Sequence, residues 1–376
     1  MKTGPAQARG ATISFGQTRA ITRRQLLGRL AASLPLVAGA VSLFGVETAS
    51  WKRFGVGAYS YSLHWKAARD AAGNGRFKDS LGFLDYCHGL GAAGVQVAVG
   101  SKEPAYAAKI RARAEALGMY FEGEAIFPKT ESDLERFEAD VRAAKEAGAE
   151  IVRTAMLGGR RYEALQAAGA FREFAEKSWQ SLTRAEGVLK KHRIRLAIEN
   201  HKDWRVAELV DILRRLSSEW VGVCVDTGNS LALMEEPMAI VTALAPFALS
   251  AHIKDMAVKE YEDGFLLSEV PFGEGFLDLN AMVSELLRAN PRLHFNLEMI
   301  TRDPLKIPCL TPAYFATMPS VSGRELAAVV AQVRRFASQK PLPRTTGLSA
   351  AEQLALEDGN VRQCFAYARR KLPGLL

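Results

Sequence analysis

Four residues of metal-ligand type stand at the ends of four successive apolar runs in the second half of the chain. They are Glu199, Asp226, His252 and Glu298, spaced by 27, 26 and 46 residues. Three carboxylates and one imidazole form an oxygen-rich ligand set, which suits Mn²⁺, Mg²⁺ or Co²⁺ and can also hold Zn²⁺. A single strand-end acid can instead cap a helix, and a single histidine can be structural. Four in succession favour one divalent metal ion, with Mn²⁺ as the first choice.

Short β-type runs alternate with helical segments along most of the chain. Strands are expected at 54–60, 94–99, 119–122, 150–156, 194–199, 221–226, 249–253 and 294–299. Helices are expected at 81–90, 104–117, 131–147, 170–191, 206–216, 237–245, 279–289 and 322–337. Eight such units predict an α/β fold, a (β/α)8 TIM barrel. A doubly wound open sheet is the alternative, but no GxGxxG follows the first run. In a barrel the four residues above would meet at the catalytic face.

Three parts of the chain follow from this pattern: a leader over residues 1–50, the barrel over 51–338 and a C-terminal extension over 339–376. The stretch 301–321 contains four prolines and is expected to be a working loop after the eighth strand. The extension holds one further helical pattern, at 350–372. We expect it to wrap around the barrel or to contact another subunit, which would make the protein a homo-oligomer.

The positive charge of the chain lies in its leader. Residues 1–40 contain six basic residues and no acidic ones, so the remainder has 43 basic against 41 acidic side chains. This nearly neutral body gives no reason to expect nucleic-acid binding. Thr22–Leu27 resembles a twin-arginine export motif and precedes an apolar stretch over 30–46, which predicts a periplasmic or otherwise exported protein. No membrane span is expected beyond that signal. The four cysteines are far apart and predict free thiols.

The motifs around the four ligands resemble those of a known family. They are Ile198–His201, Asp226–Asn229, His252–Asp255, Gly273–Gly275 and Leu297–Glu298. Over about residues 54–338 the chain is similar to the xylose-isomerase-like sugar phosphate isomerase/epimerase superfamily. The resemblance implies that Glu199, Asp226, His252 and Glu298 bind the metal. It also implies that Glu199 and Glu298 are the catalytic acid/base pair.

The chemistry implied is proton abstraction next to a carbonyl. A divalent ion that binds the carbonyl oxygen and the adjacent hydroxyl of a sugar acidifies the carbon-bound proton and stabilises the resulting enediolate. One carboxylate removes the proton and the other can return it to the opposite face. A hydride shift is the other route in the superfamily. An exported protein encounters little phosphorylated sugar, so a free sugar, keto-sugar or glycoside is the expected small-molecule substrate.

Further residues are candidates for substrate binding. They are His201, Lys254, His64, Glu124 and Asn229. His201 can equally be structural, and Lys254 can equally be solvated. Trp65 and Arg153 can line the pocket, or serve in packing and in an ion pair. Many members of the superfamily have histidine where this chain has Asn229.

Two other functional classes stay open. The same site could drive elimination or hydrolysis of 3-keto-glycosides, as a metal-dependent lyase or hydrolase. A non-catalytic sugar-binding protein is the third hypothesis, although retention of all four ligand types argues against it. A trinuclear nuclease is disfavoured because the chain has only six histidines, none of which ends the second or third predicted strand.

Overall fold

The computed structural model describes residues 52–70 and 75–376, together with Met1. The expected leader, with its twin-arginine motif, lies outside the described residues, and export therefore stays a prediction. In the part of the chain that is described, no helix combines the length and the apolar character needed to cross a bilayer.

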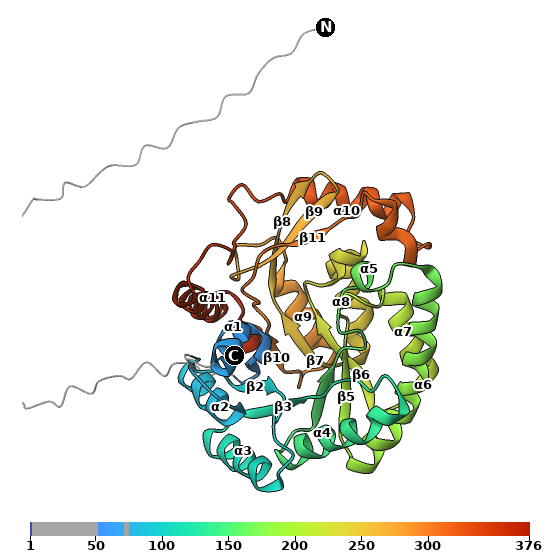
Figure 1. Ribbon diagram of the computed structural model, residues 1–376. Coiled ribbons are helices and arrows are strands. Elements are labelled where there is room, and N and C mark those ends of the chain that lie inside the picture. The colour runs from blue at the N-terminus through green and yellow to red at the C-terminus, as the bar shows by residue number, and fades with distance from the viewer. Residues whose placement is uncertain (2–51, 71–74) are drawn as a thin grey trace, which may run out of the picture. The chain divides into compact units, whose positions relative to one another are not determined.

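Eight parallel strands close into a barrel in the order β1-β10-β7-β6-β5-β4-β3-β2 (Figure 1). Their bounds are β1 (Phe54–Gly57), β2 (Gly94–Val97), β3 (Tyr120–Glu124), β4 (Ile151–Thr154), β5 (Arg195–Glu199), β6 (Val221–Asp226), β7 (Ala248–Ile253) and β10 (Phe295–Leu297). All eight predicted strands are confirmed, and so is the (β/α)8 TIM barrel. β6 has the predicted bounds, and the other strands differ from theirs by one to three residues at one or both ends. The first strand is shortened most at its end, because residues 58–61 form a short 3-10 helix directly after β1.

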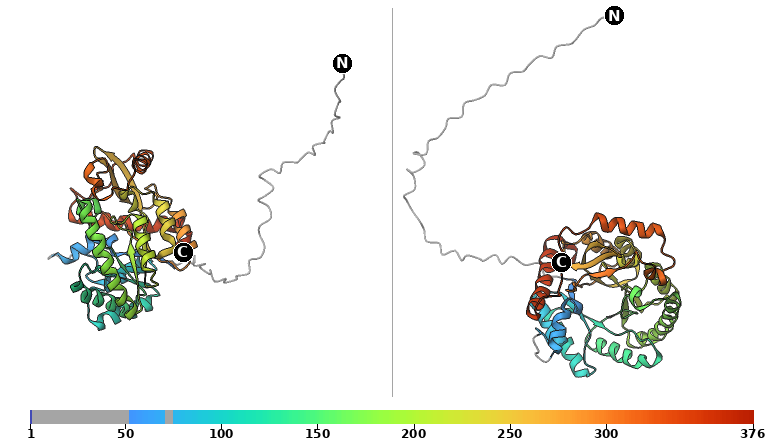
Figure 2. Two further views of the ribbon diagram at one scale, coloured as in Figure 1. Left: turned by 90° about the vertical axis from the view of Figure 1, so that its right-hand side faces the viewer. Right: turned by 45° about the horizontal axis from the view of Figure 1, so that its top comes forward.

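Helices surround the barrel strands, as the two further views show (Figure 2). Their bounds are α1 (Ser62–Arg69), α2 (Ser80–Gly89), α3 (Pro104–Leu117), α4 (Leu134–Glu146), α5 (Arg161–Ala164), α6 (Ala168–His192), α7 (Val206–Leu216), α8 (Pro237–Leu244), α9 (Leu279–Ala289), α10 (Gly323–Arg335) and α11 (Ala350–Lys371). Local signals explain several ends. For instance, α3 begins at a proline and stops where Gly118 takes a left-handed conformation with φ of 63°.

A second, three-stranded antiparallel sheet was not expected from the sequence. It consists of β8 (Asp255–Tyr261), β9 (Gly264–Val270) and β11 (Leu305–Ile307), in the order β11-β9-β8. The hairpin turn lies at Glu262-Asp263, where Tyr261 pairs with Gly264. The proline-rich stretch 301–321 is therefore not simply a loop, because it supplies β11. The hairpin also accounts for the long spacing between His252 and Glu298.

The last two helices pack on different parts of the molecule. Val329 and Val333 of α10 lie in the apolar cluster beneath the second sheet. In contrast, α11 packs on the barrel, where the ring of Phe365 lies 4.7 Å from that of Phe54 in β1. The buried Glu357 of α11 accepts hydrogen bonds from the backbone around the start of α1. The C-terminal extension therefore wraps the barrel, as one of the two expectations had it.

Candidate metal centre

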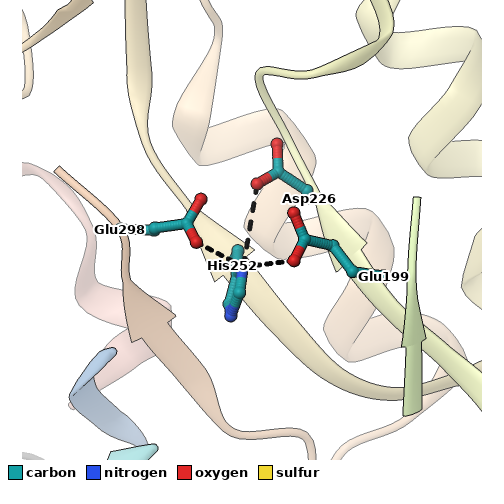
Figure 3. A group of neighbouring side chains, drawn as sticks. All are labelled: Glu199, Asp226, His252 and Glu298. Atoms are coloured by element: carbon teal, nitrogen blue, oxygen red, sulfur yellow. Dashed lines mark ion pairs between the residues drawn. The ribbon is translucent and has the colours of Figure 1, made fainter. Parts of the chain in front are cut away.

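The four predicted ligands meet at the carboxyl end of the barrel (Figure 3). Glu199 and Asp226 are the last residues of β5 and β6, His252 is next to last in β7, and Glu298 directly follows β10. In the parallel strand registers, Asp226 of β6 and Asn296 of β10 both lie opposite His252 of β7. As a result, one ligand atom from each residue lies within 4.8 Å of the others. All four side chains are buried.

The imidazole of His252 lies at the centre of this group. Its Nδ1 atom is 3.6 Å from Glu199 Oε2, 3.8 Å from Asp226 Oδ2 and 3.2 Å from Glu298 Oε1. This buried nitrogen has no hydrogen-bond partner in the described part of the chain. A polar atom buried without such a partner points to a group that binds there.

The other nitrogen of His252 is held by a chain of polar side chains inside the barrel. Gln96 Nε2 donates a hydrogen bond of 2.9 Å to Glu122 Oε2, so Gln96 directs its oxygen toward the histidine. That oxygen lies 2.6 Å from His252 Nε2 and can only accept. Nε2 must therefore carry the proton. In the neutral imidazole this arrangement leaves the Nδ1 lone pair facing the three carboxylates, as a metal ligand requires.

Two basic side chains neutralise the carboxylates. Arg153, next to last in β4, pairs with Glu199, and Lys254 Nζ lies 2.7 Å from Asp226 Oδ2 and 2.5 Å from Glu298 Oε2. Burial alone would raise the pKa of both glutamates. The charge of Arg153 outweighs burial at Glu199, and the charges of His252, when protonated, and of Lys254 do so at Glu298, so the pKa of each glutamate lies well below the ordinary value. Both carboxylates are therefore ionised and able to bind a cation or to accept a proton.

Asparagines after β5 and β6 brace the acidic ligands. Asn200 Oδ1 accepts a hydrogen bond of 2.7 Å from the backbone N–H of Asp226. Asn229 donates through Nδ2 to Glu199 Oε1 at 2.9 Å, and its Oδ1 accepts from Lys202. The structure thus places Asn229 at the site, fully buried, where it holds a ligand in position. Substrate contact by Asn229 stays a prediction.

Glu124 and His201 lie beside the four ligands with unused polar atoms. Glu124 Oε1 and His201 Nδ1 are buried and have no hydrogen-bond partner among the described residues. Burial raises the pKa of Glu124, although the charge of Arg153 opposes it. Burial lowers the pKa of His201 to about 3, so its imidazole is neutral. Both side chains thus have a buried polar atom free to form a hydrogen bond, and their contact with a substrate stays a prediction.

An open pocket of about 340 Å³ adjoins Glu124 at the carboxyl ends of β1 to β3. Its lining includes Tyr59, Ser62 and Trp65. The ring of Tyr59 lies 5.3 Å from the Arg153 guanidinium, which connects this pocket to the ligand Glu199. An aromatic wall of this kind can stack on the apolar face of a sugar ring.

The structure does not bring His64 to this group. Its side chain is 2% exposed, and Nδ1 lies 2.8 Å from Glu357 Oε2 of α11. The ring packs against Tyr61 and Phe77. The cause is the helical turn that starts directly after β1, which carries residue 64 away from the strand end. The contacts of His64 join α1 to α11, in place of the substrate-binding role expected for it.

Sequence reasoning did not identify Gln96, Lys202 or Arg302. Gln96 is a polar residue at an inward-facing position of an apolar strand, and that signal was available. Lys202 directly follows the Glu-Asn-His motif. Arg302 donates to Glu269 of β9. Its role could not be predicted, because the hairpin that contains β9 was not expected from the sequence. Glu274 lies in a turn whose Gly273 and Gly275 N–H groups donate to Asp255.

The fold and the site define the class of protein. Residues 84–318 match the family model described as xylose isomerase-like TIM barrel, and the chain belongs to this family. It is similar in fold to a D-psicose 3-epimerase crystallised with D-fructose, with a TM-score of 0.55 at 15% identity over 84% of this chain and 98% of that one. It is also similar to a protein titled IOLI with a bound zinc atom, with a TM-score of 0.50 at 15% identity over 76% of this chain and 100% of the other.

A curated relative matches a shorter part of the chain. The 3-oxo-isoapionate decarboxylase of Pectobacterium atrosepticum is 29% identical over 103 residues. That match spans 27% of this chain and 37% of the relative.

Proposed function

We propose that this protein is a divalent-metal-dependent isomerase or epimerase of a sugar or keto-sugar. The observation that carries the proposal is the placement of Glu199 and Glu298 on opposite sides of His252, with Asp226 completing the group (Figure 3). Two ionised carboxylates that flank one cation position can serve the two faces of a carbon atom between them.

The residues present fit a metal ion. Glu199, Asp226, Glu298 and Nδ1 of His252 would hold it, and this donor set favours Mn²⁺, with Mg²⁺, Co²⁺ and Zn²⁺ as the alternatives. When bound, such an ion polarises a carbonyl and stabilises negative charge on its oxygen.

The side chains of the protein supply the proton transfers. One of the two glutamates removes the proton from the carbon next to the carbonyl, which forms an enediolate, and the other returns a proton to the opposite face. Arg153 and Lys254 keep these carboxylates ionised. Glu124 and His201 offer buried hydrogen-bonding atoms for sugar hydroxyls. Burial of the whole group excludes bulk water and strengthens each electrostatic contact.

A lyase is the second candidate function, favoured by the local match to a decarboxylase. Loss of CO2 from a 3-oxo acid leaves the bond's electron pair on the carbon next to the carbonyl, which again forms an enolate-type anion. Elimination from a 3-keto-glycoside begins with the same proton abstraction. Product analysis separates these routes, because isomerisation releases no fragment. We also propose that the protein is exported, on the strength of the motif at Thr22–Leu27.

Metal analysis and solvent deuterium exchange test the proposed function. The wild type should contain about one divalent ion per chain, and Glu298→Ala should lose most of it. Glu274→Ala, in the nearby loop, is the matched control and should retain the metal. With metal present, keto-sugars incubated in D2O should gain deuterium next to the carbonyl. A folded wild type that takes up no metal even on reconstitution would refute the site and favour a sugar-binding protein.

A further inference from the structure

Lys202 is a buried lysine without an acidic partner. The residue is 2% exposed, and its Nζ atom donates to the neutral amide oxygen of Asn229. Within the described ranges 52–70 and 75–376, no carboxylate lies within ion-pair distance of it. Lysine is almost never buried this far unless its charge is paired, because removing an ammonium group from water is costly.

The neighbours of Lys202 make its charge more anomalous. Burial, together with the positive charges of Lys254 and Arg302, lowers the pKa of Lys202 to about 8, which still leaves the amine largely protonated at neutral pH. Glu269 and Asp226 are the nearby acids that could compensate, but Arg302 holds both carboxylate oxygens of Glu269 and Lys254 pairs with Asp226. Lys202 therefore has no acid of its own as an ion-pair partner.

Lys202 is also close to the metal ligands. The amide of Asn229 bridges the two, since Oδ1 accepts from Lys202 while Nδ2 donates to Glu199 at 2.9 Å. A group bound at Lys202 is thus separated from the metal ligands by the width of one side-chain amide. A single small molecule can span that distance.

We propose that Lys202 binds a carboxylate of the substrate, which makes the substrate class a keto-sugar acid. This inference rests on the proposed function, because it places the reacting carbonyl at the metal centre. A carboxylate fits better than a phosphate for two reasons. Lys202 offers a single positive charge, and phosphate sites usually add an arginine fork or a helix N-terminus, whereas Arg302 is already bound to Glu269.

Matched ligands test this assignment. D-Fructose, D-fructuronate and D-fructose 6-phosphate share one hydroxyketone and differ only at C6, and 2-keto-D-gluconate places the carboxylate at the other end. Calorimetric titration of metal-saturated wild type should show at least one of the two acids binding roughly tenfold or more tightly than D-fructose. Lys202→Met should lose that preference, Lys202→Arg should retain part of it, and Lys259→Met, at an exposed lysine of β8, should leave it unchanged.

The outcomes are distinguishable. Metal-saturated protein that shows no preference for either acid, whether it binds all the ligands alike or none, overturns the assignment. Preference for the phosphate ester over both acids overturns it as well. Metal uptake is measured beforehand, so a failure there refutes the proposed function instead. A second measurement covers folding: Lys202→Met should unfold at a higher temperature than the ligand-free wild type, because it removes a buried ammonium group that has no ion-pair partner.

Discussion

Nε2 of His252 lies 2.6 Å from Oε1 of Gln96, and this contact decides which imidazole nitrogen faces the carboxylates. Glu122 prevents the Gln96 amide from reversing, because only its Nε2 can donate to that carboxylate. Ser250 and Asn296 bind the same carboxylate oxygen. A chain of polar side chains through the barrel interior thus orients His252, a candidate metal ligand at the carboxyl end of the barrel.

Replacement of Gln96 should weaken metal binding. Gln96→Leu removes the acceptor for Nε2–H, so the histidine loses its fixed tautomer and orientation. Loss of such a supporting contact typically lowers metal affinity by about 10- to 100-fold. Competition with a chelator measures the change in metal affinity. Gln180→Leu, at an exposed residue of α6, is the control and should leave the affinity unchanged. Unchanged affinity in folded Gln96→Leu would show that the tautomer is set by other contacts.

Shortening Phe365 should destabilise the whole barrel. This residue of α11 is 5% exposed and packs on Phe54 of β1, so Phe365→Ala should lower the free energy of unfolding by about 3 to 5 kcal/mol. Leu310→Ala, at a residue that is 54% exposed, should change it by less than about 0.5 kcal/mol. Denaturant titration gives both values. A small loss at Phe365 would indicate that α11 is only loosely attached.

The buried Glu235 should make stability depend on pH. Burial raises its pKa from the ordinary 4.5 to about 7, so the folded protein binds a proton there that the unfolded chain releases. Its contribution to stability is complete below pH 4.5 and is lost as the pH rises toward 7. Glu235→Gln should therefore be more stable than wild type at pH 8, by roughly 2 to 3 kcal/mol.

Unfolding curves of the two proteins at pH 5 and pH 8 check this prediction. The stability advantage of Glu235→Gln should be small at pH 5, where the carboxyl group of the folded wild type is protonated. Glu236→Gln, at the exposed neighbouring residue, is the control and should show no such pH dependence. Equal effects of Glu235→Gln at both pH values would exclude the proton linkage.

The sequence alone determined the barrel and its four candidate ligands. Short apolar runs mark the strands, and a TIM barrel brings the carboxyl ends of its strands to one face, so Glu199 and Asp226 had to meet there. The same logic covered His252 and Glu298. These predictions needed only the local pattern and the general geometry of the fold.

Tertiary structure decided the rest, because the remaining contacts join segments far apart in the chain. The buried partner of His64 is Glu357, on the last long helix, and no local pattern connects them. The role of Gln96 depends on Glu122 and His252 across the barrel interior. The isolation of Lys202 likewise depends on Arg302 holding Glu269 of the hairpin. Burial and charge compensation are sums over such neighbours, and only the folded chain defines them.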